Sequence, residues 1–263
     1  MFDRRVRLQR AVLRFGTVLF LSGMTFGWSA CEGGRSGGSA RSGVAGTDRT
    51  PGVLNAGFVV TESVFNSELM APFDIFHHTI FRDDSVHIRP FIVSPDGKPV
   101  HTFEGLTIEA DYSFASSPPI DILVIPSTDG SMSRDLNDAA YLSFIESHSD
   151  EATWVLTLCD GAFPLAETGV LNGRIATTFP GDRDAFAERF PDVDLRYDVR
   201  FAVDGKYVTS VGGARSYEPA LWIVEQIQSR NAADLTAEGM VLEWSGSEVP
   251  HVVNGTFSAS VSE

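Results

Sequence analysis

The stretch TWVLTLCDGAFPLAETGVLNG, residues 153–173, decides the fold, because an uncharged and mostly apolar run leads directly into a cysteine, Cys159. The run at 153–158 has the length of a strand, and its composition is typical of parallel strands buried on both faces. The residues after Cys159 have helical spacing, and Gly161 permits a tight turn because it has no Cβ atom. The stretch therefore predicts a buried strand, a sharp turn that carries the cysteine, and a helix.

Strands and helices alternate along the rest of the chain from about residue 53. Apolar runs rich in β-branched residues indicate the strands, and apolar residues near helical spacing indicate the helices. This alternation predicts an α/β fold of three layers, with a doubly wound, mostly parallel, flavodoxin-like sheet that helices cover on both faces. The strands are expected at 53–60, 85–94, 106–114, 120–126, 153–158, 174–179, 193–203 and 206–211, and the helices at 67–80, 135–147, 162–171, 182–191, 216–229 and 231–244.

Cys159 stands where open α/β sheets bind ligands, at the turn beyond the carboxyl end of a strand. The following helix directs unpaired N–H groups at this turn, which is expected to stabilise a thiolate and lower the pKa of the cysteine. Serine nucleophiles of α/β hydrolases occupy such a turn, but their G-x-S-x-G pattern is absent, because Thr157 stands two positions before the cysteine. From the spacing alone two interpretations stay open, a nucleophilic thiol and a small, inert, buried residue.

The first 30 residues differ from the rest and have the layout of a signal peptide, in which arginines precede an uncharged run at 15–30. This run is diluted by glycine and serine, and it falls short of the ~20 strongly apolar residues that span a bilayer. An uncleaved anchor is the alternative. The tripeptide before Cys31 resembles the bacterial lipobox, in which the cysteine is acylated, although Trp28 replaces the usual leucine. We therefore expect export to the periplasm or cell envelope with lipidation at Cys31. The export route stays open, because Arg4 and Arg5 resemble a twin-arginine signal but the residues after them fit it poorly.

The remaining organisation follows from composition. Residues 31–52 are rich in glycine and serine and are expected to form a flexible tether, 53–245 the folded domain, and 246–263 a flexible tail. The formal net charge of −15 argues against nucleic acid as a partner and leaves a lipid anchor as the only expected membrane contact. With two distant cysteines and no clustered histidines, neither a disulfide, a metal site nor a cofactor is indicated.

The segment CDGAFPLAETGVLNGRIATTFP, residues 159–180, resembles the elbow of the ThiJ/PfpI superfamily, also called DJ-one/PfpI, which has a class I glutamine amidotransferase-like fold. SELMAPFDIF (67–76), DILVIP (121–126) and DGKYVTSVGGARSYEPALWIVE (204–225) resemble further segments of that family in the same order. The similarity extends from about Leu54 to Glu243. It is greatest to the sensor-type domains attached to AraC-type regulators and to isocyanide-hydratase-like members.

The resemblance implies a reactive nucleophile-elbow cysteine, Cys159, paired with Glu68. The carboxyl group would be protonated because it is buried beside a thiolate, and it would donate a hydrogen bond to the sulfur. A helix-start glutamate that only complements the helix dipole is the alternative. Such a cysteine would be open to oxidation to sulfinic acid. The N–H groups of Asp160 and of the loop at Ser127 are expected to stabilise developing negative charge. The expected binding residues are Ser127, Thr128, Gly161, Thr178 and Glu218.

Two departures from the family pattern limit what the resemblance implies. Many relatives have a histidine after the two threonines, where this chain has Phe179, so the Cys-His arrangement for acyl transfer is missing. The sequence PSTDGS (126–131) replaces the P-G-G of the loop that helps to form an oxyanion hole. Both departures argue against a protease or an amidase.

Two functions therefore stay open. The first is an enzyme, a hydratase or hydrolase of the isocyanide-hydratase type, in which Cys159 attacks an electrophilic carbon of a small molecule. The second is a non-catalytic module that binds a small molecule or senses redox conditions. About twenty residues follow the last predicted helix, too few for the two helix-turn-helix units of an AraC regulator, so direct DNA contact is not expected. The resemblance also makes a homodimer an expectation, although the sequence indicates no interface.

Overall fold

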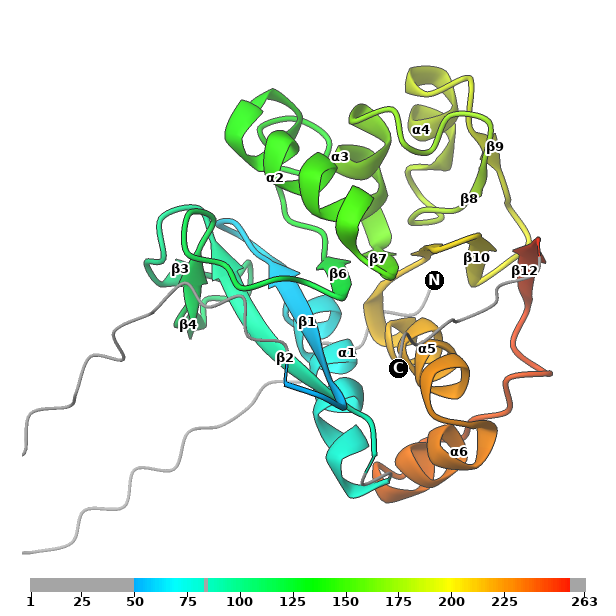
Figure 1. The fold of residues 1–263 in the computed structure, drawn as a ribbon. Coiled ribbons are helices and arrows are strands. Elements are labelled where there is room, and N and C mark those ends of the chain that lie inside the picture. The colour runs from blue at the N-terminus through cyan, green and yellow to red at the C-terminus, as the bar shows by residue number, and fades with distance from the viewer. Residues whose placement is uncertain (1–49, 83–84, 256–263) are drawn as a thin grey trace, which may run out of the picture. The chain divides into compact units, whose positions relative to one another are not determined.

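The computed structural model describes residues 50–82 and 85–255, which form an eight-stranded sheet flanked by helices (Figure 1). The strand order is β12-β10-β11-β7-β6-β1-β2-β5, and all neighbours are parallel except β10 and β11. Two short pairs, antiparallel β3–β4 and parallel β8–β9, lie outside this sheet. The strands are β1 (Val53–Val59), β2 (His87–Ser94), β3 (Val100–His101), β4 (Thr107–Ile108), β5 (Tyr112–Ser113), β6 (Ile122–Ile125), β7 (Trp154–Leu158), β8 (Ile175–Ala176), β9 (Asp194–Leu195), β10 (Phe201–Asp204), β11 (Tyr207–Ser210) and β12 (His251–Asn254).

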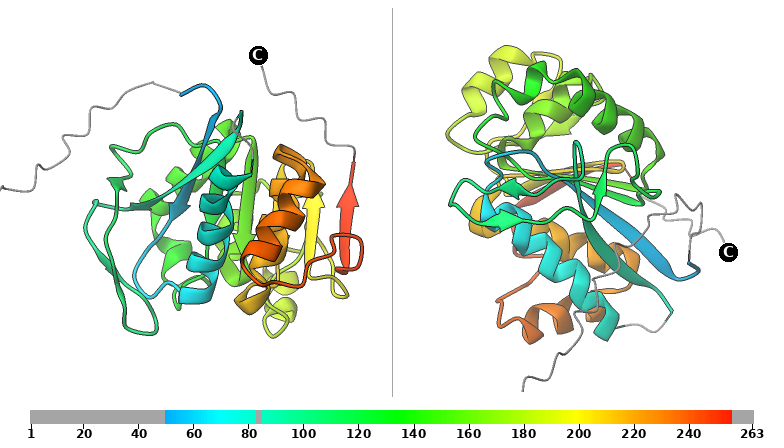
Figure 2. Two further views of the ribbon diagram at one scale, coloured as in Figure 1. Left: turned by 90° about the horizontal axis from the view of Figure 1, so that it is seen from below. Right: turned by 90° about the vertical axis from the view of Figure 1, so that its left-hand side faces the viewer.

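Helices cover both faces of the sheet. Helices α1, α5 and α6 lie on one face, and α2, α3 and α4 lie on the other (Figures 1 and 2). This arrangement confirms the predicted three-layer, mostly parallel α/β fold. The α-helices are α1 (Asn66–His78), α2 (Ala139–Glu151), α3 (Ala162–Glu167), α4 (Arg183–Arg189), α5 (Tyr217–Ile227) and α6 (Arg230–Gly239), and the short 3₁₀ helices are η1 (Thr79–Phe81), η2 (Asp135–Asn137), η3 (Cys159–Gly161) and η4 (Gly213–Arg215).

The central strands are mostly apolar because each of their faces packs against a different helical layer. Along β1, Phe58 belongs to the hydrophobic cluster on the α1 side, whereas its neighbour Val59 belongs to the cluster on the α2 side. The Phe58 ring lies 5.2 Å from the Phe73 ring of α1, measured between centroids. Successive strand side chains point to opposite faces, so a strand covered on both sides is apolar at most of its positions.

The topology brings three loops together at one edge of the sheet. The chain crosses from β1 to β2 through α1 on one face and from β6 to β7 through α2 on the other, while β1 and β6 are neighbours. The sheet therefore has a topological switch point between these strands, where open α/β folds bind their ligands. Glu68 comes from the element after β1, Ser127 follows β6 and Cys159 follows β7.

Three predicted strands are broken or much shorter than expected. The segment 193–203 divides into β9 and β10, and in the other two side chains occupy backbone groups that a continuous ladder would use. The segment 106–114 divides into β4 and β5, and between them the Asp111 carboxylate accepts the Ile92 N–H at 2.9 Å. Of the segment 174–179, only Ile175–Ala176 is a strand, and it lies outside the main sheet. The Ile175 N–H donates to the Asp204 carboxylate at 3.0 Å instead of joining that sheet.

The C-terminal region corrects two further expectations. Helix α6 ends at Gly239 rather than near 244, and Val241 follows with a φ of 57°, a left-handed conformation that a helix cannot continue through. Within the segment expected as a flexible tail, His251–Asn254 forms β12, which pairs in parallel with β10 at the end of the sheet. The β-branched residues of HVVN suit this added strand.

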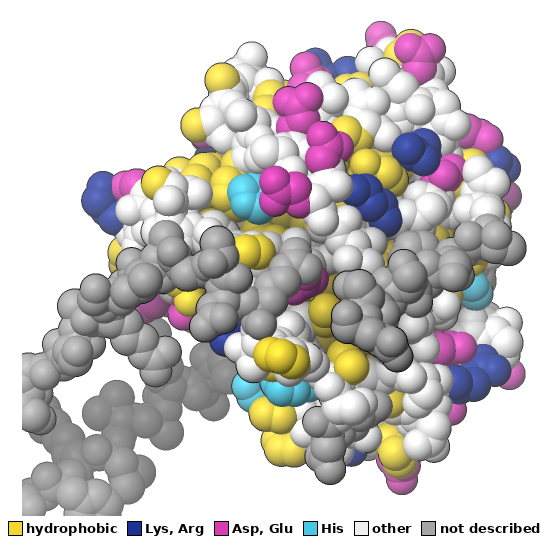
Figure 3. All heavy atoms as spheres, in the orientation of Figure 1, with side chains coloured by type: hydrophobic (Ala, Val, Ile, Leu, Met, Phe, Trp, Pro, Cys, Tyr) yellow, Lys and Arg dark blue, Asp and Glu magenta, His cyan; other side chains and the backbone are white. Residues whose placement is uncertain are grey.

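The expected signal peptide, the lipidated Cys31 and most of the tether lie outside the described residues. Within residues 50–82 and 85–255, no helix has the length and apolar character that a membrane crossing requires. On the face shown in Figure 3, acidic side chains are interspersed with lysine and arginine.

Candidate active site

The cysteine lies at a sharp elbow between β7 and α3. Cys159 has a φ of 54°, in the left-handed region that residues with a Cβ atom rarely adopt, and its side chain is 8% exposed. Such a conformation costs on the order of 1–3 kcal/mol and persists only where surrounding structure imposes it. The strain falls on the cysteine itself, whereas Gly161 has an ordinary φ of −56°.

Two glycines hold the elbow in place by close approach of the backbone. A Cβ atom on Gly161 would lie 2.1 Å from the carbonyl oxygen of Ile125, so this glycine lets the elbow pack against the end of β6. A Cβ atom on Gly212 would lie 2.4 Å from the Cβ of Cys159, so the loop after β11 closes over the cysteine from the other side. Gly161 therefore permits the tight turn through the absence of a Cβ atom, because a side chain there would clash with the end of β6.

The structure brings Glu68 to the cysteine. Glu68 lies in the first turn of α1 and is 4% exposed, so it does more than complement the helix dipole at a solvated helix start. Its Oε2 accepts hydrogen bonds from the Ser127 N–H at 3.1 Å and from the Ser127 hydroxyl, and its Oε1 accepts one from the Gly213 N–H at 3.2 Å. A side-chain hydrogen bond links Glu68 to Cys159. Because Glu68 takes the Ser127 N–H, that group is not free for the oxyanion role predicted for it.

Burial controls the ionisation of this pair. Burial raises the pKa of Glu68, and the hydrogen bonds from Ser127, Gly213 and Cys159 offset only part of the rise. Burial also raises the pKa of the Cys159 thiol, as do the negative charges of Glu68 and Asp160, although the Ser127 hydroxyl and the Asp160 N–H act the other way. The prediction that the following helix lowers this pKa is therefore wrong, since burial and two carboxylates outweigh a six-residue helix. Both shifts favour the protonated, uncharged form of each group.

A second carboxyl group lies beside the elbow. Asp160 has a pKa raised to about 7, first by burial and then by a hydrogen bond and charge repulsion from Asp182, the residue before α4. The Thr178 Oγ1 lies 3.0 Å from both the Asp160 carboxylate and the Cys159 carbonyl oxygen, so this predicted binding residue braces the elbow. Asp182 was not predicted, and nothing beyond its place before a helix distinguishes it in the sequence.

The two predicted binding residues of the 126–131 loop, Ser127 and Thr128, have different surroundings. Ser127 is fully buried against Glu68, as the hydrogen bonds above require. Thr128 instead directs its hydroxyl to the Asp135 carboxylate and accepts the Gly130 N–H at 2.9 Å. The hydrogen bonds of the Thr128 side chain are therefore with its own loop and η2 rather than with the elbow.

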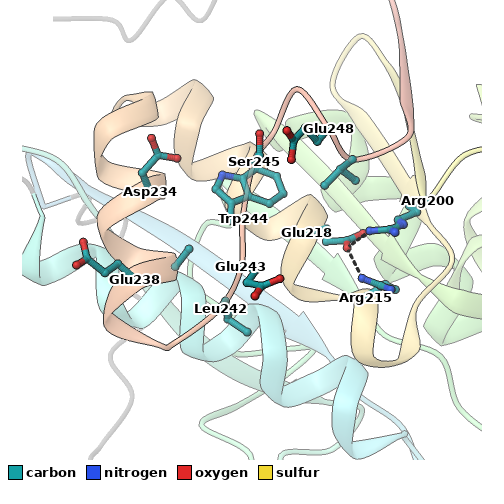
Figure 4. Close-up of a pocket in the computed structure, with 12 residues that line it drawn as sticks. Arg200, Arg215, Glu218, Asp234, Glu238, Leu242, Glu243, Trp244, Ser245 and Glu248 are labelled. Carbon is teal, nitrogen blue, oxygen red and sulfur yellow. Dashed lines mark hydrogen bonds and ion pairs between the residues drawn. The ribbon is translucent and has the colours of Figure 1, made fainter.

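Glu218 lines a cavity beside the start of α5. Its Oε1 accepts from the guanidinium groups of Arg200 at 2.6 Å and Arg215 at 3.0 Å (Figure 4). These three residues lie at one end of a cavity of about 740 Å³ between the start of α5 and the segment after α6. Cys159 is not among the residues that line this cavity, and the expectation that Glu218 borders a pocket at the cysteine stays a prediction.

The histidine of the family pattern has no replacement at its own position. Phe179 is 43% exposed, and its side chain offers no ionisable group. His78, at the end of α1, instead contacts the carbonyl oxygen of Asp74 at 2.7 Å. In the part of the chain that the structure describes, no group of three or more histidine, cysteine or acidic side chains is arranged to hold a metal ion.

The fold and the elbow define the class of protein. The sequence pattern of the DJ-1/PfpI family matches residues 55–226, which include Glu68, Ser127, Cys159 and Asp182. This chain belongs to the DJ-1/PfpI family.

The proteins that this chain resembles include an enzyme and a transcriptional regulator. Isonitrile hydratase from Pseudomonas putida is 26% identical over 183 residues, which cover 69% of this chain and 75% of that protein. The HTH-type transcriptional regulator CdhR from Pseudomonas aeruginosa is 26% identical over 190 residues, which cover 72% of this chain and 54% of the regulator. The crystal structure of a THiJ/PfpI family protein from Pseudomonas syringae has a TM-score of 0.65 at 22% identity, covering 74% of this chain and 77% of that one.

Proposed function

We propose that this protein is a cysteine-dependent hydratase, in which Cys159 attacks the electrophilic carbon of a small molecule of the isocyanide type. The observation that carries the proposal is the arrangement at the elbow. Cys159 is held in a left-handed conformation, and its side chain is hydrogen-bonded to the Glu68 carboxyl group in a buried site. Similarity to an isonitrile hydratase over three quarters of that enzyme's length supports this choice of substrate class.

The first chemical step starts from the form of the site in which Cys159 is a thiolate and Glu68 is protonated. As the sulfur bonds to the terminal carbon of the isocyanide, the protonated Glu68 donates to the same carbon, giving a thioimidate on Cys159 and a Glu68 carboxylate. The Asp160 N–H, which hydrogen-bonds to the sulfur, stabilises the thiolate before attack. Water then adds to the thioimidate carbon and the thiolate leaves, so that the isocyanide gains the elements of one water molecule and becomes a formamide.

The test is turnover of benzyl isocyanide, followed by NMR as formamide release. We expect formation of the formamide by the wild-type protein and by Cys31→Ser, which removes the other cysteine of the chain. Cys159→Ala is expected to show only the uncatalysed rate, and Glu68→Gln to lose the proton-donating step. Formamide release that persists in Cys159→Ala would overturn the proposal.

A second candidate, a non-catalytic small-molecule or redox sensor, is favoured by one specific observation. Phe179 stands where acyl-transfer members have a histidine, so the elbow lacks that base. A sensor would bind an isocyanide or formamide without converting it, or would take up two oxygen atoms at Cys159 when treated with peroxide. Intact-mass spectrometry after peroxide treatment, together with absence of turnover, distinguishes the sensor from the hydratase.

We also propose that the chain is exported and anchored through an acylated Cys31, on the basis of the lipobox-like sequence before it. In a bacterial host fed an alkyne-labelled fatty acid, the wild-type protein and Cys159→Ser should both be labelled. Label on the Cys31→Ser variant would contradict this assignment.

A further inference from the structure

The cavity beside the start of α5 carries opposite charges at its two ends (Figure 4). One end, the arginine end, holds two guanidinium groups, and the other, the acidic end, holds two carboxylates of α6, with an aromatic ring between them. In that order the residues are Arg200 and Arg215, Asp234 and Glu238, and Trp244. The volume of about 740 Å³ lies within the range of sites that hold small molecules.

The arginine end has hydrogen-bond donors to spare. The Nη1 atoms of Arg200 and Arg215 both donate to Glu218 Oε1, at 2.6 Å and 3.0 Å. Among the described residues this is the only hydrogen bond that either guanidinium group makes, although each group carries five N–H donors. Two positive charges against one negative charge leave an excess, and a planar guanidinium group binds a carboxylate through two parallel N–H groups. This end can therefore hold a carboxylate.

The acidic end has no cation of its own. Asp234 and Glu238 are one turn apart on α6, so their exposed side chains lie on the same face of the helix, where like charges repel. Within residues 50–82 and 85–255, neither carboxylate forms an ion pair or a hydrogen bond. The guanidinium group of Arg82 also contacts α6, but it donates to Thr236 at 3.2 Å, on a different face of the helix. A bound ammonium group would relieve the repulsion at this end.

The wall between the two ends is partly apolar. Trp244 and Leu242 are partly buried and Val249 is buried, so a methylene chain can pack along this wall. A cation can in addition lie over the face of an indole ring. Glu243 and Glu248 also line the cavity, which makes five carboxylates against two guanidinium groups and a net charge of −3. This excess makes the ammonium group of a ligand its stronger anchor.

We propose that this cavity binds an extended zwitterion of the ω-amino acid class, with its carboxylate at the arginine end, its ammonium group at the acidic end and its methylene chain along Trp244. The separation of the two ends selects this class, because an α-amino acid carries both charges on one carbon. Cys159 does not line the cavity, so the inference goes beyond the proposed hydratase function and does not depend on it.

The first experiment needs no substitution. Isothermal titration calorimetry of the full chain compares 6-aminohexanoate with three ligands that each lack one feature. Hexanoate has no ammonium group, hexylamine has no carboxylate, and norleucine is an isomer of the probe with both charges on one carbon. Loss of a hydrogen bond to a charged group weakens binding by at least ~10-fold, so each of the three should bind that much more weakly than 6-aminohexanoate. Equal affinities, or no saturable binding of 6-aminohexanoate at millimolar concentration, would overturn the proposal.

Variants at each end locate the two charges of the ligand. Asp234→Asn and Arg215→Gln should each weaken binding of 6-aminohexanoate by at least ~10-fold. Asp184→Asn and Arg189→Gln are the matched controls, because both residues are exposed and neither lines the cavity, and Arg189 pairs with the Glu167 carboxylate at 2.8 Å. Asp234→Asn should bind hexanoate as the wild type does, which a general loss of structure would not allow. Wild-type affinity for 6-aminohexanoate in both cavity variants would contradict the assignment.

Tryptophan emission locates the ligand independently. Trp154 and Trp222 are buried in the core, so a change in emission on binding should come from Trp244. Trp244→Phe keeps an aromatic wall and should bind the probe without that change, whereas an equal change in this variant would place the ligand elsewhere and overturn the proposal. Cys159→Ala should bind 6-aminohexanoate with wild-type affinity whether or not isocyanide turnover is found, so failure of the hydratase function and failure of this site are distinguishable.

Discussion

Two adjacent glycines allow the strain at the elbow to be tested against a matched control. Gly212 and Gly213 both have positive φ angles, 73° and 57°, but their surroundings differ. A Cβ atom on Gly212 would meet the Cβ, N and Cα atoms of Cys159 at 2.4–2.8 Å, whereas a Cβ atom on Gly213 would meet nothing within 4 Å. Gly212→Ala therefore pushes on the nucleophile, and Gly213→Ala does not.

The expected magnitudes follow from backbone and packing terms. Gly213→Ala places a residue with a Cβ atom at positive φ, which costs on the order of 1–2 kcal/mol. Gly212 has a ψ of −155° with its positive φ, a region that is almost restricted to glycine. Alanine there costs about 1–3 kcal/mol in backbone strain, and overpacking against Cys159 adds about 1–3 kcal/mol. Taking the middle of these ranges, we expect Gly212→Ala to lower the free energy of unfolding by about 2 kcal/mol more than Gly213→Ala.

The assay is urea-induced unfolding of both variants, paired with alkylation of Cys159 by iodoacetamide in the folded state. Gly212→Ala should also change the alkylation rate, because the elbow must move to admit the new methyl group. Gly213→Ala should leave the rate near that of the wild type. Equal destabilisation of the two variants, with equal alkylation rates, would refute the view that the loop after β11 holds the cysteine in its strained conformation.

Two further predictions concern ionisation at the site. The Asp160 pKa of about 7 exceeds its ordinary value of 3.8, so the folded state binds more protons than the unfolded state between these pH values. The free energy of unfolding therefore falls as the pH rises through this window, by at most about 4 kcal/mol. The free energy of unfolding of Asp182→Asn, measured with urea at pH 5 and pH 8, should fall less than that of the wild type, and an equal fall would contradict the pairing. The Ser127 hydroxyl donates a hydrogen bond to Glu68, and its hydrogen bond to Cys159 lowers the pKa of the thiol. Such a bond is worth ~1.5–3 kcal/mol when one partner is charged, so alkylation of Cys159 in Ser127→Ala should slow by roughly tenfold. The exposed Ser133→Ala in the same loop is the control, and an unchanged rate in Ser127→Ala would count against the contact.

The layered fold was predictable from the sequence because its central strands are buried on both faces. The runs at 120–126 and 153–158 carry almost no polar residues, and both faces of β6 and β7 pack against helices. The segment 246–263 was mispredicted as a flexible tail because its one strand has no long apolar run. Strand β12 is a short pair of valines between polar residues, and its stability comes from pairing with β10 rather than from any pattern of its own.

The site was predictable only where a local motif carried it. Cys159, Gly161 and Thr178 belong to one segment that resembles a family pattern, and Glu68 belongs to a second. Asp182 has no such signal, since its contact with Asp160 depends on how the chain turns after β8, and that segment was expected to continue as a strand. The sign of the thiol's pKa shift was also missed, because it depends on burial and on Glu68 and Asp160 lying together, neither of which local sequence specifies.

The position of β12 has a consequence for how copies of this protein can meet. An unpaired edge strand offers a row of N–H and C=O groups on which a strand from another molecule can form. Here the chain covers the β10 edge with its own C-terminal residues, through four residue pairs from Phe201–His251 to Asp204–Asn254. A truncation before residue 251 would uncover β10 and turn it into a template for a foreign strand. A C-terminal deletion made to improve crystallisation would therefore promote self-association, even though it leaves Cys159 and its partners untouched.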